Sequence, residues 1–219
     1  ESVWCLWPAR PIGLIEVVGG SYLATNPQIS YRLLLEALTE KNLAVHSWSY
    51  LPGLDHQAQA NEAWRSFRNT RQELEARVGL LPASLRLGHS LGCKLHLLAP
   101  DGGRKSNSLV ALSFNNFTAN RSIPMLKKLA PRLGFKTEFS PSPQETLRII
   151  KERYIQPKNH IISFSEDNLD QNQSLLNCLK KRTNDESHFL CLDGGHLTPA
   201  SAGLREGLLG GKGENPSRR

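Results

Sequence analysis

The sequence predicts an α/β protein with a mostly parallel sheet of about six to seven strands and helices on both faces. Short apolar runs alternate along the chain with longer stretches that repeat apolar residues every three or four positions. These are the patterns of buried strands and amphipathic helices. The connections between strands are long enough for the helical crossovers that parallel neighbours require. With 219 residues, of which 39% are hydrophobic, the chain can form one large domain.

In the first half of the chain we expect two strand–helix pairs. The expected elements are, in order, a strand over residues 12–18, a helix over 28–41, a strand over 44–49 and a helix over 60–78. Gly19 and Gly20 end the first strand, Asn42 ends the first helix, and Gly79 closes the long one. Glycine and asparagine are typical at such ends because they adopt backbone conformations that other residues avoid.

The second half continues the alternation. The expected strands cover residues 84–87, 109–114, 160–164 and 188–192. The expected helices cover residues 91–98, 175–179 and 199–209, the last of them with a proline at its start. Residues 1–206 are therefore expected to form a single domain, and the Gly-rich, basic residues 207–219 a flexible tail.

Residues 115–159 interrupt this alternation of strands and helices. They contain a helix whose start is marked by a capping box of Ser142 and Glu145, with Pro143 in the first turn. An insertion of this length between two strands predicts a small cap over the carboxyl edge of the sheet, where ligands bind in open α/β folds. The alternative is an ordinary long crossover connection.

Composition argues against several classes of protein. The formal charge is +7 and the pI about 9.4, but the basic residues are scattered and not interleaved with aromatic ones, which disfavours nucleic-acid binding. The apolar runs are far shorter than the ~20 residues of a membrane-spanning helix. The four cysteines lack zinc-ligand spacing, so we expect buried thiols in a reducing compartment rather than disulfides or metal ligands.

The most informative motif is Gly88-His89-Ser90-Leu91-Gly92, a G-x-S-x-G pentapeptide. An apolar run leads into it and an amphipathic helix follows, which is the context of the nucleophile elbow of the α/β-hydrolase fold. A serine on so sharp a turn has strained backbone geometry, and the glycines on either side avoid clashes. The sequence therefore predicts Ser90 as a nucleophile.

A serine nucleophile needs a base and a carboxylate that orients the base, and in this fold they follow it in the order acid, then histidine. His196 is the one histidine that follows the last expected strand, and it is the predicted base. Asp167 and Asp170 both follow the strand over 160–164. We favour Asp167 because of its distance from the strand end, while Asp170 is the alternative acid or a cap for the next helix.

Acyl transfer also needs backbone N–H groups that stabilise the oxyanion. The N–H of Leu91 is one expected donor, and that of Gly20 or Ser21 is the other. Further polar residues near strand ends are candidates for lining the pocket, namely His89, Asp55, His56, Asn115 and Asn116. For the last four, roles in turns and helix caps are the alternative.

Beyond the elbow, several segments carry a family resemblance. They are Gly19–Tyr22, Pro27–Arg32, Asp55–Gln57, Ser113–Phe117, Ser140–Pro143, Leu169–Gln171 and His196–Pro199. With these segments the chain resembles, from about residue 12 to 205, an α/β-hydrolase-like family of unknown function found in cyanobacteria and plant chloroplasts. The resemblance implies the fold and a cyanobacterial cytoplasm or plastid stroma, and it implies no substrate. Because Asp170 lies in a shared segment, it stays a candidate acid.

The expected function is that of a serine hydrolase that cleaves an ester or thioester of a small or lipid-like acyl compound. The chemistry requires no metal or organic cofactor, because the triad and the oxyanion donors supply it. Two alternatives remain open. One is a binding or assembly protein that keeps the fold without turnover and has a protein partner. The other is an acyltransferase that uses the same serine with an acceptor other than water.

Overall fold

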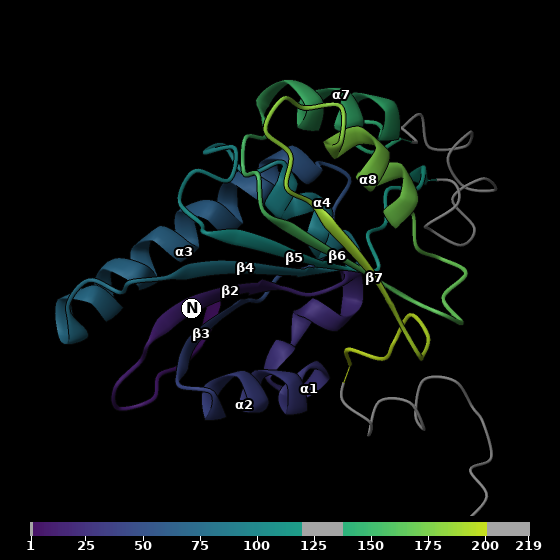
Figure 1. Cartoon of the computed structure of the whole chain (residues 1–219). Helices are drawn as coiled ribbons and strands as arrows, with labels where there is room; N and C mark the ends of the chain where they lie inside the picture. The colour runs from purple at the N-terminus through teal and green to yellow at the C-terminus, as the bar shows by residue number, and fades with distance from the viewer. Residues whose placement is uncertain (1, 120–137, 201–219) are drawn as a thin grey trace, which may run out of the picture.

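The centre of the molecule is a seven-stranded sheet, seen in a computed structural model that describes residues 2–119 and 138–200 (Figure 1). The strands are β1 (Val3–Leu6), β2 (Gly13–Val18), β3 (Leu43–Trp48), β4 (Ser84–His89), β5 (Ser108–Leu112), β6 (Asn159–Phe164) and β7 (His188–Leu192). Their order across the sheet is β1-β3-β2-β4-β5-β6-β7, and all neighbours are parallel except β1 and β3. The predicted fold class is confirmed.

Helices cover both faces of this sheet (Figure 1). They are α1 (Pro27–Ser30), α2 (Arg32–Glu40), α3 (His56–Val78), α4 (Leu91–Leu97), α7 (Pro143–Arg153) and α8 (Asn172–Leu179), with a 3₁₀ helix η1 (Ser21–Thr25) after β2. Helices α1 and α2 lie on one face, and α3, α4, α7 and α8 on the other. Ile15 and Val17 of β2 pack with Leu35 of α2, whereas Val18 packs with Leu95 of α4, because strand side chains alternate between faces.

Local sequence explains where several helices begin and end. Asp55 caps α3 through its Oδ1, which accepts a hydrogen bond from the Ala58 N–H at 2.9 Å. Gly79 follows this helix with a φ of 82°, and Asn42 follows α2 with a φ of 59°. Ser142 caps α7 by accepting from the N–H of Glu145, so the predicted start of this helix is confirmed.

Two elements differ from the expectation. The antiparallel edge strand β1 was not predicted, because its pairing with β3 is a contact between distant parts of the chain. The single helix expected over residues 28–41 is two helices that meet at Tyr31, whose φ of −120° is outside the helical range. Tyr31 is buried between them, and its hydroxyl contacts the site described below.

Some expectations concern residues that the structure does not describe. Residues 120–137 of the expected cap, the expected final helix beyond Ala200 and the tail over 207–219 all lie outside the described residues. Within residues 2–119 and 138–200, no helix is long and apolar enough to cross a membrane.

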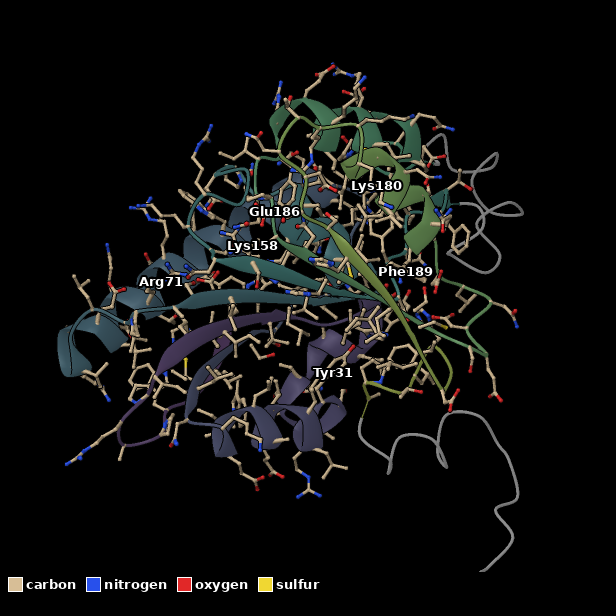
Figure 2. The ribbon with its side chains drawn as sticks, in the orientation of Figure 1. Tyr31, Arg71, Lys158, Lys180, Glu186 and Phe189 are labelled. Atoms are coloured by element: carbon tan, nitrogen blue, oxygen red, sulfur yellow. The ribbon has the colours of Figure 1, made fainter. Side chains whose placement is uncertain are left out.

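A charged cluster of Glu16, Arg71, Arg86 and Asp101 lies between the sheet and the α3 face (Figure 2 marks Arg71 on α3). Arg86 of β4 donates two hydrogen bonds to the Asp101 carboxylate, at 3.0 and 2.9 Å, and a longer one of 3.4 Å to Glu16 of β2. Arg71 donates to the other oxygen of Glu16 at 2.7 Å. Burial lowers the pKa of Arg86, but the two carboxylates outweigh it, so the net shift is upward.

Candidate active site

The predicted site residues come together at the carboxyl edge of the sheet. Gly20 follows β2, Ser90 follows β4, Asp167 follows β6 and His196 follows β7. Because parallel strands end at the same edge, loops that are far apart in sequence meet there (Figure 1).

Ser90 has the strained backbone that the motif predicts. It lies between β4 and α4 with φ 54° and ψ −119°, a region that residues other than glycine rarely adopt. Its N–H donates to the carbonyl oxygen of Leu112, the last residue of β5, at 2.9 Å. The side chain is therefore held at a sharp turn between a buried strand and a buried helix.

The flanking glycines are required by close backbone approach. A Cβ on Gly88 would lie 2.5 Å from the Cα of Cys93, and one on Gly92 would overlap the carbonyl oxygen of Val18. Neither neighbour can yield, because both are main-chain atoms of buried elements. The turn thus packs α4 directly against the end of β2.

Ser90, His196 and Asp167 form a continuous chain of hydrogen bonds. The Ser90 hydroxyl donates to His196 Nε2 at 3.1 Å, and His196 Nδ1 donates to Asp167 Oδ2 at 2.8 Å. The Asp167 side chain is 0% exposed, and its other oxygen accepts from the Leu169 N–H at 2.8 Å. Acyl transfer by a serine requires this arrangement, in which the serine contacts the histidine and the histidine contacts the carboxylate.

The electrostatics of Asp167 favour its ionised form. Burial raises the pKa of this carboxyl, but the nearby Ser113 hydroxyl, the Leu169 N–H and His196 outweigh burial and hold the pKa below its ordinary value. Asp170, the alternative acid, is placed elsewhere: its Oδ1 accepts from the Asn172 N–H at the start of α8, at 3.3 Å.

A second hydrogen-bond chain joins three of the loops at this edge. The Gly20 N–H donates to the Tyr31 hydroxyl at 2.8 Å, and that hydroxyl donates to His89 Nδ1 at 2.7 Å. His89 Nε2 donates to the main-chain oxygen of His196 at 2.8 Å. Burial lowers the pKa of His89 to about 4, so the ring is neutral at physiological pH. Tyr31 reaches this network from the face that carries α1 and α2 (Figure 2).

This network changes one sequence-based assignment. Because the Gly20 N–H donates to Tyr31, it is not available as an oxyanion donor. The N–H groups of Ser21 and Leu91 stand at the starts of η1 and α4, where helix geometry leaves them without an intrahelical partner. Of the two candidates after β2, Ser21 is therefore the one whose N–H has no hydrogen-bond partner among residues 2–119 and 138–200.

A cavity of about 360 Å³ lies beside Ser90. Three of the predicted pocket residues line it, His56, Asn115 and Asn116. Two do not, because Asp55 caps α3 and His89 is buried in the network with Tyr31. The cavity is also lined by Lys94 and Phe139, which the sequence did not indicate, since both come near Ser90 only through the fold.

The described part of the chain offers neither a disulfide nor a cluster of metal ligands. All four cysteines are free, and residues 2–119 and 138–200 hold no group of three or more His, Cys, Asp or Glu side chains that could bind a metal ion.

Acidification is expected to destabilise the protein, because four histidines are buried. Burial lowers the pKa of His46 and His89 to about 4, and that of His56 and His96 to about 3. Their pKa in the unfolded chain is near 6.5. As the pH falls from about 6.5 to about 4, the unfolded state binds more protons than the folded one, so the free energy of unfolding decreases. Equal urea midpoints at about pH 7.5 and pH 5 would contradict this expectation.

Comparison with solved structures supports the fold. The monoacylglycerol lipase of Paleococcus ferrophilus is 14% identical with a TM-score of 0.61, over 90% of this chain and 91% of that one. The Thermogutta terrifontis esterase Est2, solved with butyrate bound, is 16% identical with a TM-score of 0.59, over 91% and 81%. The fluorophosphonate-binding serine hydrolase F of Staphylococcus aureus is 18% identical with a TM-score of 0.56, over 86% and 78%. Sheet, elbow and these likenesses define an α/β-hydrolase fold.

The particular family follows from the sequence. The family described as "Protein of unknown function (DUF1350)" matches residues 1–208, and the chain belongs to it. A comparison with curated protein sequences gives no match.

Proposed function

We propose that this protein is a serine hydrolase that cleaves an ester or thioester bond of a small or lipid-like acyl compound. The observation that carries the proposal is the unbroken contact from the Ser90 hydroxyl through His196 to the buried Asp167 carboxylate. Each residue has the type and partner that its role requires, and the nucleophile lines a cavity.

In the proposed reaction, Ser90 Oγ attacks the acyl carbonyl carbon while His196 Nε2 accepts the hydroxyl proton. The carbonyl oxygen becomes an oxyanion that the N–H groups of Leu91 and Ser21 stabilise. As the bond to the leaving group breaks, His196 returns the proton to the departing oxygen or sulfur. Water then repeats the sequence on the acyl-serine, which releases the acid and restores Ser90. Asp167 holds the His196 ring in the required tautomer throughout.

A fluorophosphonate probe tests the proposal without knowledge of the substrate. The wild-type protein is expected to form a covalent adduct on Ser90, identified by peptide mass spectrometry, and the Ser90→Ala variant to form none. The Ser165→Ala variant removes an exposed serine after β6 and should label at the wild-type rate. If folded wild type labels no faster than Ser90→Ala, the hydrolase proposal fails and a binding role on this scaffold is favoured.

A further inference from the structure

Lys94 is a fully buried lysine beside the proposed nucleophile. It lies on the first turn of α4, four residues after Ser90, and both side chains line the same cavity. Lys94 is 0% exposed and lines the cavity. Lysine is rarely buried so completely unless its charge is paired.

The partners of Lys94 do not neutralise it. Its Nζ donates to the carbonyl oxygen of Pro141 at 3.1 Å, which uses one of its three donor hydrogens. The one carboxylate that raises the pKa of Lys94 is that of Glu138, which lies beyond ion-pair distance. One oxygen of Glu138 accepts hydrogen bonds from the N–H groups of Ala119 and Phe139. Residues 120–137 contain no Asp or Glu, so this segment holds no carboxylate for Lys94.

Among the described residues, the other groups around Lys94 add no negative charge. Phe139 stacks against His56 of α3, with ring centroids 4.2 Å apart, and Lys94 Nζ lies 5.8 Å from the centroid of Phe139. Burial and the nearby Lys94 lower the pKa of His56 to about 3, so this ring is neutral. Burial lowers the pKa of Lys94 to about 8 against the opposing effect of Glu138, so the amine is mostly protonated at pH 7.

The cavity carries a second polar group without a partner. Asn116 donates through its Nδ2 to the carbonyl oxygen of Pro143, while its buried Oδ1 has no hydrogen-bond partner within the described residues. A protonated Lys94 and an unsatisfied Asn116 oxygen in the cavity lining suit a polar ligand better than a plain alkyl chain, which would leave the ammonium without a counter-charge.

We propose that the cavity binds an acyl group whose far end carries a carboxylate, and that this carboxylate pairs with Lys94 while Ser90 faces the acyl carbonyl. The inference rests on the proposed function, because Ser90 defines which end of the ligand reacts. A carboxylate would give the buried ammonium a charged acceptor in a site screened from water. Because Ser90 and Lys94 line one cavity of about 360 Å³, a half-ester of a short dicarboxylic acid, such as glutaric acid, is a suitable probe.

A pair of esters matched in length tests this inference. The p-nitrophenyl half-ester of glutaric acid and p-nitrophenyl pentanoate differ only in a terminal carboxylate in place of a methyl group. The wild-type kcat/KM is expected to favour the glutarate half-ester, and Lys94→Met is expected to lower that ratio by about tenfold or more. Lys158→Met removes an exposed lysine just before β6, at the opposite edge of the sheet, and should leave the ratio unchanged (Figure 2).

A binding measurement separates this inference from the proposed function. Calorimetry on Ser90→Ala compares glutaramate with pentanamide, and only glutaramate carries a carboxylate. Tighter binding of glutaramate that Lys94→Met removes supports the anion site even if neither ester is hydrolysed, in which case the hydrolase proposal alone fails. Equal binding of the two amides by a folded Ser90→Ala variant overturns the inference, whether or not the esters are hydrolysed.

A third measurement uses the wild-type protein alone and does not require that a Lys94 variant folds. Raising the pH from about 7 to 9.5 removes the proton from Lys94, so the preference for the glutarate half-ester over the pentanoate should fall. The pentanoate corrects for general effects of alkali on the reaction. A ratio that stays constant over this range would contradict the proposed pairing.

Discussion

Replacing Asp167 with Asn is expected to lower kcat for ester hydrolysis by about 10⁴-fold, the effect of losing the orienting carboxylate in a comparable triad. The carboxylate accepts a hydrogen bond from His196 Nδ1 at 2.8 Å and so keeps Nε2 free to accept the Ser90 proton. An amide at this position can donate to Nδ1 and stabilise the wrong tautomer of the ring. Steady-state kinetics with an activated ester measures the change.

The matched control is Asp170→Asn, three residues along the same loop. Its carboxylate contacts the Asn172 N–H rather than His196, so turnover should stay close to that of the wild type. Little change in stability is expected, because an asparagine Oδ1 can accept the same hydrogen bond from the Asn172 N–H. If Asp170→Asn loses the activity and Asp167→Asn retains it, the acid is wrongly assigned.

Replacing Arg86 with Leu is expected to destabilise the protein by about 3–5 kcal/mol, because the carboxylates of Glu16 and Asp101 would lose their shared partner inside the protein. Burial raises the pKa of Asp101, but Arg86 and backbone N–H groups outweigh it and hold the pKa below its usual value. The ionised Asp101 carboxylate therefore stabilises the folded protein at neutral pH, and this stabilisation is lost as the pH falls through the lowered pKa of Asp101. Urea denaturation at pH 7 measures the loss.

Arg148→Leu is the control for charge removal as such. Arg148 pairs with Glu145 and Glu152 on the outside of α7, where its side chain is 53% exposed. Ion pairs in water contribute little, so this variant should unfold at nearly the wild-type urea concentration. Equal losses in the Arg86 and Arg148 variants would show that burial of the cluster is not what makes it important.

Much of the fold could be read from local sequence. The elements that carry the site are marked by residues with few alternatives, such as Gly88 and Gly92 beside the elbow and Ser142 at the start of α7. The order of the site residues could be anticipated for the same reason. Parallel strands end at one edge, so residues that follow β4, β6 and β7 lie near one another once the sheet is known.

What the sequence did not indicate depends on contacts between distant segments. Tyr31 looks like one apolar position of a single helix. In the structure its backbone interrupts that helix, and its hydroxyl contacts Gly20 and His89. Lys94 lies among the residues of an amphipathic helix, and only packing against the segment around Pro141 shows that it is buried. Periodicity cannot distinguish such positions from ordinary core or surface ones.

The backbone conformation at position 90 makes serine less favourable there than glycine. Its φ of 54° costs about 1–3 kcal/mol for a residue with a side chain and nothing for glycine. Glycine would forfeit only about 0.4–1 kcal/mol through its looser unfolded state. Ser90→Gly is therefore expected to leave the free energy of unfolding unchanged or to raise it slightly, while it removes the hydroxyl. The chain therefore carries a hydroxyl at a position where the backbone conformation favours glycine.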